Sequence, residues 1–384
     1  MIRPFDLPET GLFVSRAWDP AVNGPVVIRV DADVVSDITS PAIPTVQALL
    51  EQGDPAQAAR TAPGRPLCSL ADLADNAIET PDPARPWPLA PCDLQAVKAC
   101  GVTFVASMLE RVIEEKAKGD PTKADGIRAR CTEILGDSLR HVVPGSAKAM
   151  DLKTALIADG VWSQYLEVGI GKDAEVFSKA QPMASVGTGS AVGLHPISSW
   201  NNPEPEIVLA VSPAGRIVGA TLGNDVNLRD VEGRSALLLG KAKDNNAACA
   251  IGPFIRLFDD SFSLDDVRRI ELELTVSGTD GFILTGQSSM SAISRDPLDL
   301  VAQAMGRHHQ YPDGMMLFLG TLFAPTQDRD VPGEGFTHKL GDAVRIHAPA
   351  LGSLKNTVRL STEAPEWTFG TAALMHNLAR RNLI

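Results

Sequence analysis

Two glutamates and one aspartate lie close together in a segment whose apolar pattern predicts two strands. The run NNPEPEIVLAVSPAGRIVGATLGNDV, residues 201–226, contains Glu204, Glu206 and Asp225. Residues two apart in an extended strand face the same side, so Glu204 and Glu206 should share one face. If the two apolar segments form a hairpin, Asp225 returns to the start of the first strand. Three carboxylates placed together repel one another unless a cation lies between them.

Carboxylate oxygens without a nearby His or Cys suit a hard divalent cation. The triad therefore predicts a Mg²⁺ or Mn²⁺ site with open positions for water or substrate. The same spacing also fits a solvated acidic turn, and spacing alone leaves both interpretations open.

Composition excludes several other classes of protein. The chain has 384 residues, and its 35 Lys and Arg against 47 Asp and Glu give a net charge of −12. No basic patch stands out, which argues against nucleic acid or an anionic membrane surface as the main partner. Met1 to Phe13 lack a signal-peptide pattern, and no stretch reaches about 18 apolar residues. The five cysteines are dispersed without a CxxC pair, so we expect free thiols in a reducing cytoplasm.

Apolar periodicity predicts the elements that position the triad. The expected strands cover 206–211, 216–222, 269–277, 281–285, 315–320, 343–348 and 352–361, and the expected helices cover 107–118, 124–139, 150–165, 297–307 and 369–380. The proline-rich segment 61–92 is expected to be an extended connector, because proline breaks helices and central strands. We therefore predict a small N-terminal domain over 1–95 and an α+β domain, mostly antiparallel, over 96–384.

Several strings around the triad resemble the fumarylacetoacetate hydrolase superfamily. They are PEPEIVLAV, GNDVNLRD and AKDNNAACAIGPFI, followed by MMLFLGTLFAP and HKLGDAVRIHAPALGSLKNTV, in the family's order over roughly residues 101–358. The resemblance implies a mixed β-roll with flanking helices and a homodimer or higher homo-oligomer. It also implies a Mg²⁺ or Mn²⁺ held by Glu204, Glu206 and Asp225 that chelates a small 2-oxo acid.

The resemblance implies roles for two more residues. Lys243 falls where the family keeps a lysine near the metal, with Lys241 as a nearby competitor. A neighbouring divalent cation would push a lysine toward its neutral form, so that it could take a proton from carbon 3 of the substrate. The alternative for Lys243 is a surface ion pair. Thr321, in LGTLFAP, sits where a family threonine contacts the substrate carboxylate.

The first predicted helix departs from the family's hydrolases, which carry a His-x-x-Glu pair there. The stretch GVTFVASMLER has Ser107 at the histidine position and Glu110 three residues on, and both stay candidate catalytic residues. A serine without a partner is not a general base near neutral pH, so Ser107 is not expected to activate the water molecule that hydrolysis requires. The seven histidines are scattered and expected to be structural or exposed. Arg229 and Asp230 are expected to pair beneath the metal site, and Arg111 fits either a structural or a functional role.

The string DAEVFSKAQP resembles the sugar-acid dehydratase branch of the superfamily, which has a Glu two residues before a Phe. Here these are Glu175 and Phe177, with Lys179 following as an expected substrate-binding residue. A carboxyl group over a leaving hydroxyl can protonate it, so Glu175, with Glu110, is the expected general acid. The predicted function is a metal-dependent dehydratase that converts a 2-keto-3-deoxy pentonate of the D-xylonate or arabinonate series to 2-oxoglutarate semialdehyde. The alternative is an acylpyruvate or diketo-acid hydrolase of the same superfamily.

Overall fold

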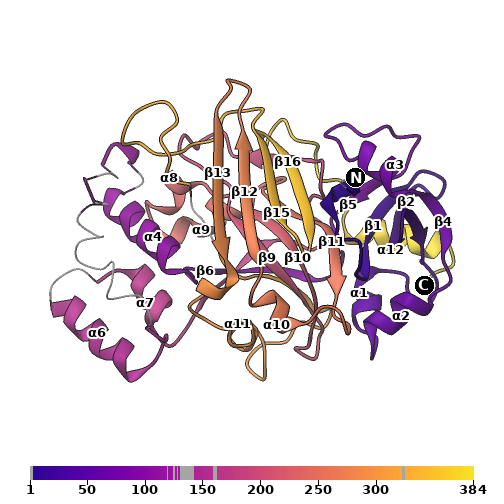
Figure 1. Cartoon of the computed structure of the whole chain (residues 1–384), viewed down its shortest axis with the longest axis horizontal. Coiled ribbons are helices and arrows are strands. Elements are labelled where there is room, and N and C mark those ends of the chain that lie inside the picture. Colours follow the sequence, from indigo (N-terminus) through magenta and orange to yellow (C-terminus); the bar gives the residue numbers. More distant parts are fainter. Residues whose placement is uncertain are drawn as a thin grey trace.

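The chain folds into two β-sheets with helices around them (Figure 1). The computed structural model describes residues 3–118, 120–123, 126, 127, 129, 142–158, 162–321 and 325–384. Within these residues, no helix combines the length and the apolar composition that crossing a bilayer requires.

The larger sheet runs from the N-terminal strands into the centre of the molecule. In spatial order its strands are β4 (Arg65–Ser69), β3 (Val34–Asp37), β2 (Gly24–Asp31), β1 (Phe13–Asp19), β11 (Cys249–Leu257), β10 (Ile217–Asp225), β9 (Pro205–Val211), β14 (Met315–Phe318), β6 (Ala96–Gly101) and β7 (Glu175–Ala180), with β5 (Trp87–Leu89) paired to β1. Only the β14–β6 pair is parallel among these described strands.

The second sheet has five strands in the described part of the chain. They are β13 (Ile283–Ser289), β12 (Glu271–Ser277), β15 (Ala343–Ala348), β16 (Gly352–Leu360) and β8 (Ala191–Leu194). The β16–β8 pair is parallel and the other pairs are antiparallel. The predicted α+β class with mostly antiparallel strands is confirmed, and each predicted strand appears with shifts of a few residues at its ends.

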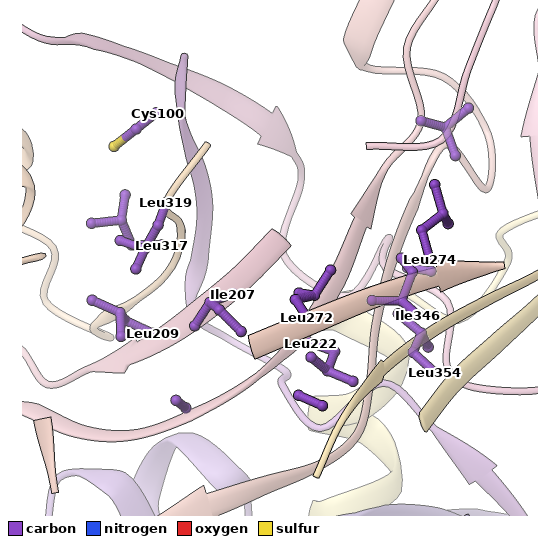
Figure 2. Packing of buried hydrophobic residues seen from close by; sticks show 14 of the residues in the cluster. Cys100, Ile207, Leu209, Leu222, Leu272, Leu274, Leu317, Leu319, Ile346 and Leu354 are labelled. Atoms are coloured by element: carbon purple, nitrogen blue, oxygen red, sulfur yellow. The ribbon is translucent and has the colours of Figure 1, made fainter. Parts of the chain in front are cut away.

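The core explains why β9 is apolar from Ile207 to Val211. All seven residues of β9 are buried, because the strand is covered on both faces. Ile207 and Leu209 belong to the main core cluster, together with Leu274 and Ile346 from the second sheet (Figure 2). Val208, from the opposite face of β9, packs into a separate cluster. Burial of each large apolar side chain of β9 contributes about 1.5–3 kcal/mol to the stability of the fold. This burial fixes the position of the strand that contains Glu206 and directly follows Glu204.

Helices cover the ends and edges of the two sheets. They are α1 (Val46–Leu50), α2 (Pro55–Thr61), α3 (Leu70–Asp75), α4 (Val105–Ala117), α6 (Ala147–Ala158), α7 (Gln164–Ile170), α8 (Arg229–Glu232), α9 (Leu239–Lys243), α10 (Leu264–Val267), α11 (Pro297–Ala304) and α12 (Thr371–Arg380), with 3₁₀ turns at Pro4–Asp6, Pro121–Lys123, Ala236–Leu238 and Met290–Ala292. The helices predicted over 107–118, 297–307 and 369–380 are confirmed as α4, α11 and α12. The helix predicted over 124–139 lies largely outside the described residues.

The single helix predicted over 150–165 is two helices in the structure. The first, α6, ends at Ala158, and the second, α7, begins at Gln164. Ser163 caps α7, because its side chain accepts a hydrogen bond from the backbone N–H of Tyr165. A serine in this role starts a new helix.

The expected connector over 61–92 is wrong, because this segment contains β4, α3 and β5. Its prolines fall mostly between these elements, and Pro66 is tolerated in β4 because β4 lies at the edge of the sheet. Strand β1 pairs with β11, with Val14 opposite Ile255, so the N-terminal strands continue the central sheet. The C-terminal helix α12 packs on them, and Asn377 Nδ2 donates to the Asn23 carbonyl at 2.9 Å. A domain boundary near residue 95 stays a prediction.

Candidate active site

The β9–β10 hairpin brings the predicted carboxylates together. Asn224 lies opposite Pro205, and the Asp225 N–H donates to the Glu204 carbonyl at 3.0 Å. Gly215 allows the connecting turn, because its φ of 76° lies in the left-handed region that favours glycine. One carboxylate oxygen from each of Glu204, Glu206 and Asp225 lies within 4.8 Å of the other two, and all three residues are buried. A solvated acidic turn is therefore excluded.

Two lysine ammonium groups lie against the triad. Lys243, the last residue of α9, has its Nζ 2.5 Å from Glu204 Oε2 and 3.0 Å from Asp225 Oδ2. Lys179, from β7, lies 2.8 Å from Asp225 Oδ1 and donates to the carbonyls of Val226 and Lys243 at 3.2 and 2.5 Å. Lys179 is fully buried beneath the triad and is not part of the cavity wall. The structure thus places this expected substrate-binding residue where it positions Asp225 and the end of α9.

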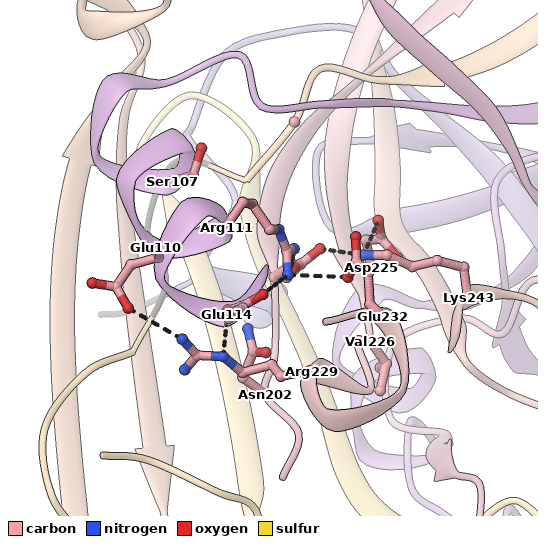
Figure 3. A network of polar contacts seen from close by, with 12 residues as sticks. Ser107, Glu110, Arg111, Glu114, Asn202, Asp225, Val226, Arg229, Glu232 and Lys243 are labelled. Carbon is pink, nitrogen blue, oxygen red and sulfur yellow. Dashed lines mark hydrogen bonds and ion pairs between the residues drawn. The ribbon is translucent and has the colours of Figure 1, made fainter. Parts of the chain in front are cut away.

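Arg111, from α4, is the third cation of the site. Its guanidinium contacts Glu204, donates to Glu114 Oε2 at 2.8 Å and lies 3.0 Å from Glu232 Oε2 (Figure 3). Arg111 therefore links α4 to the metal-ligand triad and to α8. Of the two roles that the sequence left open for Arg111, these contacts favour a residue of the site.

Arg229 shares the carboxylate of Glu114 with Arg111. It donates to Glu114 Oε1 at 2.6 Å and to Glu110 Oε2 at 3.2 Å. The expected pair of Arg229 with Asp230 is wrong, because Asp230 accepts hydrogen bonds from the hydroxyl of Ser198 and the backbone of Ser199 instead. Neighbours on a helix point in different directions, so adjacent charges need not meet.

Burial and neighbouring charges set the pKa values of the triad and its lysine. Burial raises the pKa of Glu206 well above its usual value, and the charges of Asp225 and Glu204 add to the effect. Burial alone would lower the pKa of Lys243, but the charges of Asp225 and Glu204 outweigh it and raise that pKa strongly. The expected neutral Lys243 is therefore not the form that these carboxylates favour without a metal. It stays a prediction for the metal-loaded site.

The charges of the site fit a divalent cation. Five carboxylates line the cavity: Glu175, Glu204, Glu206, Asp225 and Glu232. Three cations lie against them: Arg111, Lys179 and Lys243. Two negative charges are therefore uncompensated when all the groups are ionised. Among the described residues, no Lys or Arg pairs with Glu206, which accepts only the Gly320 N–H at 2.8 Å. An all-oxygen triad in a cavity with this deficit suits Mg²⁺ or Mn²⁺.

A small cavity opens over the triad. Besides the five carboxylates, its wall contains Cys100, Gly101, Val102, Arg111, Phe177, Lys243 and Thr321. Cys100 is part of this wall, although no cysteine lies near the triad in the sequence. Burial and the charge of Glu206 raise the pKa of the Cys100 thiol, so it stays protonated and is a poor metal ligand.

Glu175 lies at the start of β7, opposite Gly101 of β6. Its Oε2 lies only 1.9 Å from the position that a Cβ on residue 101 would take, so glycine makes the room for this carboxyl group. Burial and the charge of Glu232 raise the pKa of Glu175 to about 7. A carboxyl group with this pKa holds a proton in a large fraction of molecules at neutral pH.

Of the remaining predicted site residues, Thr321 lines the cavity, whereas Ser107 and Glu110 do not. A substrate-binding residue must lie in the cavity wall, as Thr321 does. Ser107 is buried and its hydroxyl donates to the Phe104 carbonyl at 2.9 Å, while Glu110 points toward Arg229 (Figure 3). Neither Ser107 nor Glu110 belongs to the cavity wall, so the structure does not bring them to the triad. No histidine of the described residues lines the cavity either.

Glu232 reaches the cavity from α8 and was not predicted from the sequence. Its position three residues after Arg229 on a short helix carries no motif. Its partner Arg111 is far away in the sequence, so no local spacing could reveal the pair.

The chain is similar to a known family and to several known proteins. Residues 176–359 match the family described as "Fumarylacetoacetate (FAA) hydrolase C-terminal". The chain is 32% identical over 194 residues to a "Probable 2-keto-3-deoxyxylonate dehydratase" of Haloferax volcanii, covering 50% of this chain and 63% of that protein. It is 31% identical over 188 residues to a "2-dehydro-3-deoxy-D-arabinonate dehydratase" of Saccharolobus solfataricus, covering 48% of this chain and 58% of that protein. The chain thus matches less than two thirds of the length of either relative.

The fold has a solved counterpart over most of the chain. A crystal structure described as "2-keto-3-deoxy-D-arabinonate dehydratase complexed with magnesium and 2,5-dioxopentanoate" superposes with a TM-score of 0.62 at 20% identity, covering 91% of this chain and 99% of that one. This likeness confirms the expected mixed β-roll with flanking helices. The matched family segment, residues 176–359, contains Glu204, Glu206, Asp225 and Lys243, so these site residues lie in the part of the chain that is similar to the family.

Proposed function

We propose that the protein is a metal-dependent hydro-lyase that converts a 2-keto-3-deoxy pentonate, of the D-xylonate or arabinonate series, into 2-oxoglutarate semialdehyde. The observation that carries the proposal is a cavity with more carboxylates than cations, in which the Glu204, Glu206 and Asp225 triad lies together with a carboxyl group whose pKa is about 7. Two relatives named as sugar-acid dehydratases support the reaction class. The related fold complexed with magnesium and 2,5-dioxopentanoate, which is the proposed product, supports the metal. A homodimer and a cytoplasmic location stay predictions.

Glu204, Glu206 and Asp225 would hold the Mg²⁺ or Mn²⁺ ion. When bound, the ion acts as a Lewis acid on the keto group of a 2-oxo acid and offsets the negative charge that develops as a proton leaves C3. Thr321, in the cavity wall, is proposed to contact the substrate carboxylate. Arg111 contacts Glu204 and Lys179 pairs with Asp225, so these ligands are held in place and need little rearrangement when they bind the cation.

Lys243 is the proposed base for the C3 proton. Without metal, its ammonium is the countercharge of Glu204 and Asp225. With a divalent cation as their countercharge, a second positive charge on Lys243 is disfavoured, and its neutral amine can accept the proton. The position of Nζ beside two metal ligands places it close to any 2-oxo acid chelated there.

Glu175 is the proposed acid for the leaving hydroxyl group at C4. The C3–H and C4–O bonds break, the proton of Glu175 goes to the departing oxygen, and one water leaves. A shift of the new double bond toward C5 then gives the aldehyde. Ser107 and Glu110 lie outside the cavity wall, so we propose no direct contact of either with the substrate.

Glu206→Gln tests the metal site. This substitution keeps the shape of the side chain and removes the negative charge that no Lys or Arg compensates. We expect Mg²⁺ affinity in titration calorimetry to fall at least about 10-fold, and Mg²⁺-dependent turnover of a 2-keto-3-deoxy pentonate to fall with it. Glu167→Gln, at a half-exposed position paired with Lys153, is the matched control and should behave like the wild type. Unchanged Mg²⁺ affinity and turnover in Glu206→Gln would overturn the assignment.

A further inference from the structure

The cavity contains one carboxylate for which the proposed reaction has no use. Glu232 ends α8, its side chain is only 6% exposed, and it lines the cavity wall. It is not one of the three grouped metal-ligand candidates. Its closest cationic neighbour, Arg111 Nη1, lies 3.0 Å from Oε2.

The Oε2 atom of Glu232 is a buried acceptor without a well-aligned hydrogen bond among the described residues. Arg111 Nη1 donates to Glu114 Oε2 at 2.8 Å and forms an ion pair with Glu232 Oε2 at 3.0 Å. A buried carboxylate oxygen without a hydrogen bond is costly, and the ion pair offsets part of that cost. A hydroxyl group of a ligand in the cavity would supply the missing hydrogen bond. The contact with Arg111 keeps the carboxylate oriented for that purpose.

Glu232 and Glu175 act on the same region of the cavity. Both side chains line the same cavity, Glu175 from the start of β7 and Glu232 from the end of α8. A 2-oxo acid anchored at the triad extends its other end away from the metal. If Glu175 serves the C4 hydroxyl, the next polar group along the chain is the hydroxyl at C5.

We propose that Glu232 accepts a hydrogen bond from the terminal hydroxyl group of the substrate and thereby selects hydroxylated 2-oxo acids over those with apolar tails. The assignment rests on the proposed function for the identity of the substrate. Its chemistry follows from a buried charged acceptor, which rejects a ligand without the matching hydroxyl because the acceptor then stays unpaired.

Two ligands that differ only at C5 test the assignment without turnover. They are 5-hydroxy-2-oxopentanoate and 2-oxopentanoate, and neither has a C4 hydroxyl to lose. In titration calorimetry of the full chain with saturating Mg²⁺, the wild type should bind the hydroxylated ligand about 10- to 100-fold more tightly. Glu232→Leu should bring this ratio close to one while its affinity for 2-oxopentanoate stays near that of the wild type.

Two further variants keep the test decisive if the leucine protein fails to fold. Glu232→Gln preserves the side-chain shape and should reduce the ratio, because a neutral acceptor makes a weaker hydrogen bond than a carboxylate. Glu167→Gln, at a half-exposed position outside the cavity wall, is the matched control and should keep the wild-type ratio. A wild-type ratio in Glu232→Gln and Glu232→Leu, or equal weakening of both ligands, would overturn the assignment. A wild-type enzyme that keeps the preference but dehydrates no sugar acid would instead overturn the proposed function.

Discussion

Gly101→Ala should separate the position of the proposed acid from the metal site. An ideal Cβ at residue 101 would lie 1.9 Å from Glu175 Oε2 and 2.7 Å from its Cδ, where real Cβ atoms come no closer than 3.0 Å. The carboxyl group must therefore move by about 1 Å, and a displacement of this size costs about 100-fold in rate when it affects a reacting group. Gly101 does not have a positive φ, so alanine adds no backbone strain.

The assay is kcat for a 2-keto-3-deoxy pentonate at saturating Mg²⁺, with Mg²⁺ affinity measured in parallel. We expect a loss of about 10- to 100-fold in kcat and unchanged Mg²⁺ affinity. Glu175→Asp, which shortens the side chain, should cost less in the Gly101→Ala background than in the wild type. Gly53→Ala is the control, because nothing lies within 4 Å of its Cβ position. A wild-type kcat in Gly101→Ala would refute the role of Glu175.

Three further predictions concern charge. The pKa of Glu175 is about 7, so kcat should fall as the pH rises through about 7, because the acid form is lost. The Glu175→Gln variant should lack this pH dependence. A flat pH profile of kcat in the wild type would contradict the assignment. Lys179→Met removes a buried partner of Asp225 and should lower the free energy of unfolding by about 3–5 kcal/mol in urea titrations without metal, with a smaller deficit when Mg²⁺ is added. Mg²⁺ at about 100 times its Kd should stabilise the wild type by about 2.7 kcal/mol in the same titrations, and absence of this gain would argue against the triad as a metal site.

The triad was predictable because its spacing is local. Strand periodicity puts Glu204 and Glu206 on one face, and a hairpin returns Asp225 to them whatever the rest of the chain does. The structure has this hairpin, with Asp225 bonded to the Glu204 backbone. The strand order of the second sheet was not read from the sequence, since pairing between distant strands leaves no local pattern.

Residues that meet through tertiary packing were harder to assign. Arg111 and Glu232 come from α4 and α8, and only the packed structure brings them together. Lys179 was expected to touch the substrate, but it lies fully buried under Asp225, because periodicity gives the face of a strand and not the depth of a side chain. In the segment 61–92, proline content outweighed the apolar and capping signals of β4 and α3, although Ser69 caps α3.

The most direct test of the account is the mass of the product formed with Mg²⁺. The purified full chain would be offered 2-keto-3-deoxy-D-xylonate, its C4 epimer and an acylpyruvate, each with Mg²⁺ and with a chelator. The account predicts loss of one water from a 2-keto-3-deoxy pentonate to give 2-oxoglutarate semialdehyde, only with the metal present. Uptake of water by the acylpyruvate with release of pyruvate, and no change in either sugar acid, would contradict it and identify a carbon–carbon hydrolase.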